Sequence, residues 1–247
     1  MPQLLISVKN VEEAMLVLDA GVDVIDLKDP NIGALGALDL EVSQQIVNAV
    51  QKYKQFNPAQ YQPLTSATVG ENPINYHALR EAIKLRAEIG VDVIKVASAD
   101  LLFHFEALTR DINLQEVRLM AVFFANQTID LNILQKLKDS GFYGAMLDTQ
   151  NKERNLLEVC TLQSLQRFTQ ACQKTGLKSG LAGSLKPQHI EQLVVINPSY
   201  MGFRGGACEN NARRNGLNPH KLLEIKNMLY EHNKINGLAQ QAWVCVA

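Results

Sequence analysis

The sequence has few cysteines and no long apolar run. Its four cysteines lie far apart, at positions 160, 172, 208 and 245, and form no motif of the metal-binding or redox type. We therefore expect reduced thiols in a cytosolic protein. No apolar stretch approaches the ~18 residues of a membrane-spanning helix, and no basic region precedes the strand-like residues 4–8. These absences predict a cytoplasmic protein with no membrane partner.

An excess of one charge and a cluster of histidines are also missing. Lysine and arginine number 24, and aspartate and glutamate number 25, which gives a formal net charge of −1. This balance argues against nucleic acid as a partner. The histidines show no metal-ligand spacing and lie at positions 77, 104, 189, 220 and 232. We expect neither a metal nor a cofactor, and the sequence leaves a homo-oligomer open.

Short apolar runs alternate with amphipathic segments along the chain. The strand-like runs cover residues 4–8, 22–27, 64–69, 91–97, 118–124, 143–147, 178–182 and 200–203, and the helix-like segments cover 11–20, 40–52, 76–89, 131–139, 164–175 and 186–193. Such alternation predicts a parallel sheet covered by helices. Eight strands in 247 residues favour a single (β/α)8 TIM barrel over residues 1–232, followed by a C-terminal tail at 233–247. The alternative is an open, doubly wound sheet.

Two lysines stand in or directly after strand-like runs. Alternation along the second run puts Asp26 and Lys28 on one face, at the strand end that opens into a barrel mouth. Lys95 lies inside the fourth run, between β-branched residues. A buried lysine is destabilising unless it is paired or functional. Two interpretations stay open: an ion pair with aspartate that fills the barrel, or amines whose burial and mutual repulsion leave one of them neutral and nucleophilic toward carbonyls.

A further acid and a further lysine follow the sixth strand-like run. Asp148 comes directly after that run, and Lys152 follows in the next loop. An acid at the barrel mouth orients a lysine or transfers protons to a hydroxyl group, whereas an acid in a loop commonly caps the following helix. Lys152 taken alone is typical of a solvated loop, and only its neighbours make it a candidate.

Glycines follow the last two strand-like runs, which is where barrel enzymes frequently bind phosphate. Gly183 and Ser184 follow the seventh run, and Arg204, Gly205 and Gly206 follow the eighth. Backbone amides in such loops approach an anion closely, and an arginine adds a bidentate contact. These five residues are therefore the main candidates for holding a phosphorylated substrate.

Other polar residues near the expected mouth are candidates of a second kind. Ser66 and Thr68, on the third strand-like run, offer hydroxyl groups to the substrate or lead into a tight turn. Arg213, Arg214 and Asn215 either close over a second phosphate or project into solvent.

Eight short segments carry a resemblance to a known family. They lie at residues 5–14, 26–30, 33–37, 66–70, 94–96, 146–149, 181–184 and 204–208. In this order they resemble the (5-formylfuran-3-yl)methyl phosphate synthase family. The resemblance implies a lyase that condenses two molecules of glyceraldehyde 3-phosphate, through a lysine Schiff base, into a phosphorylated furan aldehyde with loss of phosphate and water. It also implies a place in the biosynthesis of methanofuran, a one-carbon carrier, or of its bacterial analogue.

The same resemblance assigns roles to the candidate residues. It places the Schiff-base lysine at Lys28 and the proton-accepting lysine at Lys95. It places acidic partners at Asp26 and Asp148, and a further lysine at Lys152. Two other functions stay open: another class I Schiff-base aldolase acting on a phosphorylated sugar, and a non-catalytic barrel that binds sugar phosphates.

Overall fold

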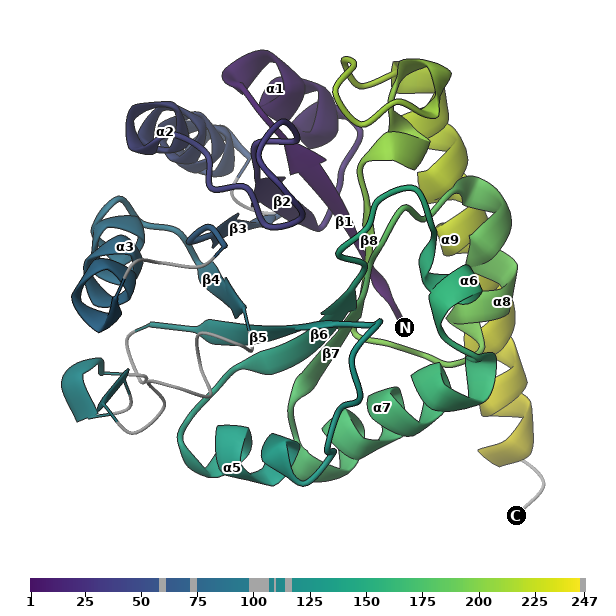
Figure 1. Ribbon diagram of the computed structural model, residues 1–247. Coiled ribbons are helices and arrows are strands. Elements are labelled where there is room, and N and C mark those ends of the chain that lie inside the picture. The colour runs from purple at the N-terminus through teal and green to yellow at the C-terminus, as the bar shows by residue number, and fades with distance from the viewer. Residues whose placement is uncertain (58–60, 72–74, 98–106, 109, 114–116, 245–247) are drawn as a thin grey trace.

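Eight parallel strands close into a barrel in sequence order (Figure 1). The computed structural model describes residues 1–57, 61–71, 75–97, 107–108, 110–113 and 117–244, with side chains as far as His232. The strands are β1 Gln3–Val8, β2 Val24–Leu27, β3 Leu64–Thr68, β4 Val93–Ala97, β5 Leu119–Phe124, β6 Gly144–Asp148, β7 Lys178–Leu181 and β8 Tyr200–Phe203. Because β8 pairs with β1, the (β/α)8 prediction is confirmed and the open sheet is excluded.

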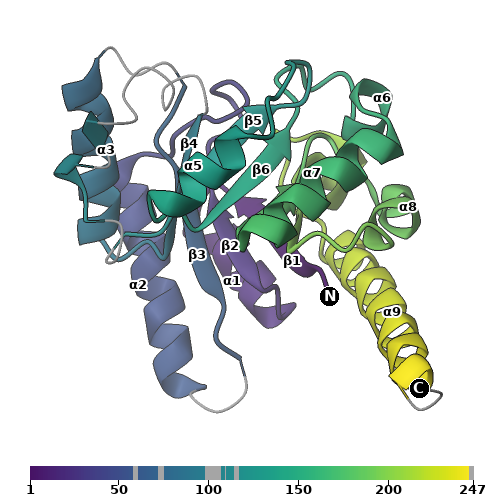
Figure 2. The same ribbon diagram turned by 90° about the horizontal axis from the view of Figure 1, so that it is seen from below.

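Helices surround the barrel on its outer side (Figure 1). They are α1 Val11–Asp19, α2 Leu40–Phe56, α3 Tyr76–Glu88, α5 Ile133–Asp139, α6 Leu156–Val159, α7 Leu162–Thr175, α8 Ile190–Val194 and α9 Pro219–Val244, with short 3-10 turns η1 Pro187–His189, η2 Gly205–Ala207 and η3 Glu209–Asn211. Figure 2 shows α2 and α9 extending beyond the strands at one end of the barrel. None of the described helices is long and apolar enough to cross a membrane.

Local side-chain chemistry explains several helix boundaries. Asn10 accepts a hydrogen bond from the backbone of α1, and Thr161 does the same for α7, so α7 begins two residues earlier than periodicity alone predicts. The expected helix at 186–193 is divided into η1, which begins at Pro187, a residue favoured at the first position of a helix, and α8, which begins at Ile190. α9 continues past residue 232, after which the sequence predicts a tail at 233–247; the side chains of that tail lie outside the described residues.

The strands bury both of their faces, as expected of a parallel sheet covered by helices. Outward-facing residues such as Ile6 and Ile94 pack in the large core between barrel and helices. Inward-facing residues such as Leu5 and Met146 form a second core inside the barrel. A Cβ at Gly180 would lie 2.9 Å from Met146 Cγ, so glycine there makes room for the methionine. This inner core fills the barrel beneath the polar residues of the mouth.

Candidate active site

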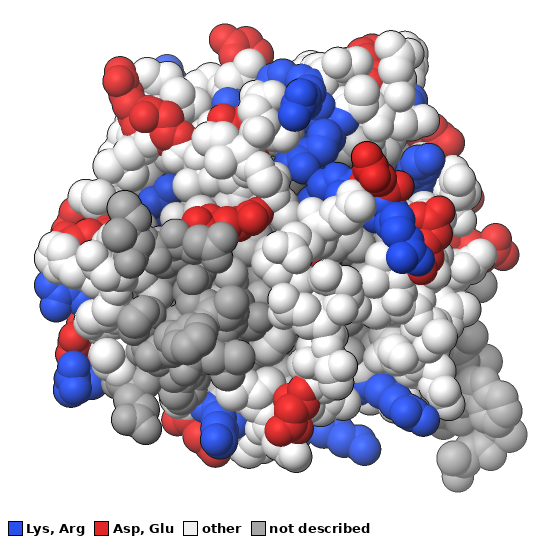
Figure 3. All heavy atoms as spheres, viewed as in Figure 1, with Lys and Arg blue, Asp and Glu red and all other residues white. Residues whose placement is uncertain are grey.

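A cavity of about 480 Å³ opens at the C-terminal ends of the strands. All five of the predicted catalytic residues line it. Its basic lining residues are Lys28, Lys95, Lys152, Lys186, Arg204 and Arg213, and its acidic ones are Asp26, Asp148, Glu153 and Glu158. Figure 3 shows basic side chains clustered in a hollow between α1 and α6. The excess of positive charge favours an anionic ligand.

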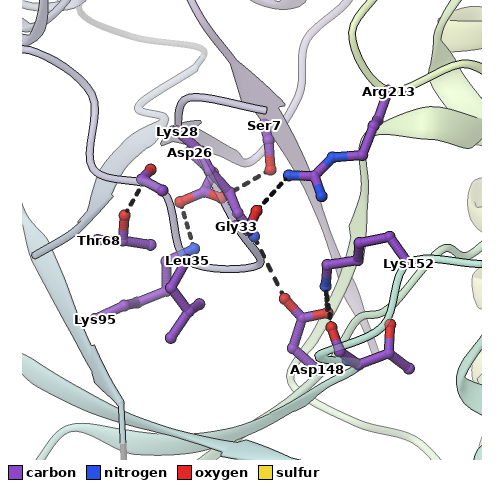
Figure 4. Close-up of polar contacts among 12 residues, drawn as sticks. Ser7, Asp26, Lys28, Gly33, Leu35, Thr68, Lys95, Asp148, Lys152 and Arg213 are labelled. Atoms are coloured by element: carbon purple, nitrogen blue, oxygen red, sulfur yellow. Dashed lines mark hydrogen bonds and ion pairs between the residues drawn. The ribbon is translucent and has the colours of Figure 1, made fainter. Parts of the chain in front are cut away.

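Asp26 is the most deeply buried charged group of the cavity, at 1% exposure. The strand register places it beside Ser7 on β1 and Ser66 on β3. Both hydroxyls donate to its carboxylate, Ser7 Oγ at 2.8 Å and Ser66 Oγ at 2.7 Å, and Lys95 Nζ forms an ion pair with it (Figure 4). Burial alone raises the pKa of Asp26, but the charges of Lys95 and Lys28 outweigh burial and hold that pKa below its ordinary value.

Lys95 shares this buried position, with its side chain 4% exposed. Burial lowers its pKa, the charge of Asp26 opposes that change, and the charge of Lys28 adds to it. The net result is a pKa below the ordinary value of 10.5. The ion pair of the first interpretation is therefore present. The lowered pKa is also the property that the second interpretation requires of a proton acceptor.

A second carboxylate, Asp148, lies between two lysines (Figure 4). Its Oδ2 is 3.4 Å from Lys28 Nζ, and its Oδ1 is 2.6 Å from Lys152 Nζ. Burial opposes ionisation of Asp148, but Lys152 and Lys28 lower its pKa to about 2. The carboxylate caps no described helix, since the N-cap of α6 is Asn155. Asp148 is therefore an ionised group that orients both amines.

Lys152 is not a solvated loop lysine, because its side chain is only 18% exposed. Burial lowers its pKa to about 8; Asp148 resists this change, and Lys28 reinforces it. Ser184 Oγ donates to the backbone oxygen of Lys152 at 2.8 Å, which ties this loop to the one after β7. A lysine with this pKa can exchange a proton near neutral pH.

Two glycine-containing loops line the cavity beyond β7 and β8. Gly183 and Ser184 have positive φ angles of 117° and 47°, and a Cβ at Gly206 would lie 2.4 Å from Leu185 O, so the loops pack closely. The amides of Gly183, Ser184, Gly205 and Gly206 donate to no acceptor within the described parts of the chain. Unpaired amides in such loops are suited to binding an anion.

Comparison with known proteins identifies the family. A model of the 4-HFC-P synthase family matches residues 4–226. The chain belongs to the 4-HFC-P synthase family. A relative from Methylorubrum extorquens, described as a putative (5-formylfuran-3-yl)methyl phosphate synthase, is 37% identical over 226 residues, covering 90% of this chain and 89% of its own. The synthase of that name from Methanococcus aeolicus is 31% identical over 235 residues, covering 90% and 96%. The family resemblance of the sequence is thereby confirmed.

Solved barrels resemble this 4-HFC-P synthase family member in fold. Phosphoribosyl anthranilate isomerase from Thermus thermophilus matches with a TM-score of 0.60 at 14% identity, covering 93% of this chain and 98% of its own. 3-Hexulose-6-phosphate synthase from Salmonella typhimurium matches with a TM-score of 0.59 at 15% identity, covering 93% and 99%. At such identities the likeness shows the TIM-barrel fold alone.

The sequence predicts that Arg204 binds phosphate, but in this 4-HFC-P synthase family member its guanidinium is bonded to protein groups. Its guanidinium pairs with Glu13 through two bonds of 2.5 and 3.1 Å. It also donates to three backbone oxygens, those of Ser7 at 3.0 Å, Arg213 at 2.8 Å and Asn215 at 2.9 Å. These bonds use all of its N–H groups. Phosphate binding by Arg204 would require at least one of them to break.

The two predicted hydroxyl ligands also have protein partners. Ser66 donates to Asp26, and Thr68, which is fully buried, donates to Gly36 O at 3.1 Å. Neither hydroxyl-bearing residue is among those that line the large cavity. Their position supports Asp26 and the loop after β2, and contact with substrate stays a prediction for both.

Sequence reasoning missed Glu13, which is 3% exposed on α1. The available signal was its helical spacing of four residues from the buried Val17, which puts an acid on an apolar face.

Within the described residues, no cluster of His, Cys, Asp and Glu side chains is arranged to ligate a metal ion.

Proposed function

We propose that this family member joins two molecules of glyceraldehyde 3-phosphate into (5-formylfuran-3-yl)methyl phosphate through an imine on Lys28. The names of its relatives supply the product. The observation that carries the proposal is the pairing of two lysines with two carboxylates in one cavity, Lys28 with Asp148 and Lys95 with Asp26. We also propose that the product is used in the biosynthesis of methanofuran or its bacterial analogue, as the sequence resemblance implies.

Lys28 is the better placed of the two lysines to meet a carbonyl. Its side chain is 11% exposed, against 4% for Lys95, and it follows the end of β2, whereas Lys95 lies inside β4. Once its amine has given up a proton, it adds to C1 of a triose and expels water, which leaves an iminium that withdraws electrons from C2. The iminium keeps a positive charge beside Lys95 and so favours the neutral form of that amine.

The carbon skeleton of the product defines the next step. It requires a bond between C2 of the imine-bound triose and C3 of the second triose. Lys95 removes the C2 proton, the carboxylate of Asp26 stabilises the ammonium group so formed, and the resulting enamine attacks C3 as phosphate leaves with the bonding electrons. Asp26 suits this role because its two serine donors favour the ionised carboxylate and fix it beside Lys95.

Ring closure then releases the lysine. The C2 hydroxyl of the second triose adds to the iminium carbon, and the amine of Lys28 departs. Loss of the remaining hydroxyl as water gives the aromatic furan. Two trioses thus yield the product, one phosphate and two waters with no change of oxidation state. Lys152, with its pKa of about 8, is suited to protonate departing oxygens and is oriented by Asp148.

The test incubates the purified protein with glyceraldehyde 3-phosphate and follows furan absorbance in the ultraviolet together with free phosphate. We expect the two signals to rise together in the wild type and to be absent in Lys28→Arg, which keeps the charge beside Asp148 but cannot form an imine. Borohydride should trap a triose adduct on Lys28 in the wild type.

Three outcomes would redirect the proposal. A trapped adduct without furan or phosphate release would indicate another class I aldolase. Triose binding without any adduct would indicate a non-catalytic sugar-phosphate barrel. Furan formation by Lys28→Arg would exclude the imine on Lys28 and require another nucleophile.

A further inference from the structure

Two arginines at the barrel mouth differ sharply in how their donors are used. All N–H groups of Arg204 have protein acceptors, and Glu13 balances its charge. Arg213 makes one side-chain hydrogen bond in the described structure, from Nη2 to Gly33 O at 2.8 Å. Its remaining N–H groups are available, and its guanidinium lines the cavity (Figure 4).

Arg213 also lacks, among the described residues, the close carboxylate partner that Lys28, Lys95 and Lys152 have. Lys28 and Lys152 share Asp148, and Lys95 has Asp26. Arg213 forms no ion pair with any residue that the structure describes. It is nevertheless half-buried, and burial lowers its pKa. A half-buried cation that faces a cavity and has no ion-pair partner in the described structure favours an anionic ligand.

The position of Arg213 is fixed by contacts of both its backbone and its side chain. Arg204 Nε donates to Arg213 O, and Arg204 is itself fixed by Glu13 on α1. On the other side, the bond to Gly33 O anchors the Arg213 guanidinium on the loop after β2. The next residue, Arg214, is exposed. The chain therefore presents one arginine of the adjacent pair to the cavity and leaves the other in solvent.

We propose that Arg213, whose guanidinium is bonded to the loop after β2, binds a phosphate group at a second anion subsite, in addition to the one offered by the amides of the loops after β7 and β8. Resting on the proposed function, the ligand is the phosphate of one of the two trioses. Two phosphorylated substrates bring two dianionic phosphate groups into one cavity. The unpaired amides of the glycine loops form hydrogen bonds to one phosphate group and leave the other without donors. Arg213 supplies a delocalised charge with a planar fork of donors for the other.

The experiment measures binding without turnover, by calorimetric titration of the full-length protein with inorganic phosphate. We expect two bound phosphate ions per wild-type chain. Arg213→Gln should weaken one of the two sites by roughly tenfold to a hundredfold, the loss of one charge-assisted contact. Arg213→Lys should restore part of the affinity. Arg214→Gln removes the same charge from the adjacent exposed residue and is the matched control, expected to bind as the wild type does.

Three results would overturn the subsite: a single phosphate site in the wild type, unchanged binding in Arg213→Gln, or equal weakening in Arg214→Gln, which would show an effect of net charge alone. Thermal unfolding of each variant separates loss of binding from loss of folding. The KM for glyceraldehyde 3-phosphate should rise in Arg213→Gln. Absence of furan in the wild type would refute the proposed function and leave the phosphate titration able to decide the subsite by itself.

Discussion

Replacing Asp26 by Asn should destabilise the protein strongly while changing its shape very little. Asparagine is nearly the same size, and one oxygen can still accept from Ser7 or Ser66. The change removes the only carboxylate paired with Lys95 in the described structure and turns an amide N–H₂ or a neutral oxygen toward its ammonium group. Lys95 must then remain as a buried unpaired cation or lose its proton.

The magnitude follows from the burial of both partners, at 1% for the Asp26 side chain and 4% for Lys95. Breaking a buried ion pair from one side costs about 3–5 kcal/mol. For a chain of this length that lowers the melting temperature by about 6–20 °C. The pKa of Lys95 should fall further without Asp26, so the unfolded chain binds more protons than the folded one. Stability should therefore recover as the pH rises toward 10.5, the ordinary value for lysine.

The assay is thermal and urea unfolding of Asp26→Asn, Lys95→Met and the double variant at several pH values. The double variant should recover most of the lost stability, because replacing both charges removes the burial cost along with the attraction. A loss below about 1 kcal/mol in Asp26→Asn would refute the reasoning. So would additive losses in the double variant, since they would show that the two side chains do not depend on one another.

Three other outcomes are expected. An NMR titration should place the pKa of Lys152 near 8, and Asp148→Asn should move it lower, because Asp148 raises it; a higher value would contradict the assignment. Gly183→Ala should cost about 1–3 kcal/mol in unfolding and weaken phosphate binding, because Gly183 has a φ of 117°; wild-type stability would contradict it. Glu13→Gln should lower the melting temperature by leaving the guanidinium of Arg204 uncompensated, and an unchanged melting temperature would contradict that.

The fold was predictable because its signals are local. Apolar runs, caps and glycines recur along the chain, and eight strands in sequence order leave one simple way to close a sheet. The convergence of Asp26, Lys28, Lys95 and Asp148 was predictable for the same reason. Strand alternation sets the face, and the parallel direction brings the strand ends together.

The partners of the arginines were not predictable in this way. Arg204 and Glu13 are 191 residues apart in sequence. No local sequence pattern indicates whether the guanidinium of Arg204 pairs with such a distant carboxylate or faces the cavity. The sequence predicts that Ser66 either offers its hydroxyl to the substrate or leads into a turn, because strand alternation gives the face of a side chain but not its depth in the barrel. In the folded protein it lies at the level of Asp26 and donates to that carboxylate.

The clasp between Glu13 and Arg204 has a consequence for the synthesis of the protein. The ribosome completes β1 and α1 early in synthesis. The partners of these elements, β8 for the edge of β1 and Arg204 for the carboxylate of Glu13, lie in the last fifth of the chain. Until then the nascent chain carries an open strand edge, a feature that invites aggregation. Nascent or truncated chains that end before Arg204 also lack the loop that carries Arg213, so the lining of the cavity is complete only when β8 pairs with β1.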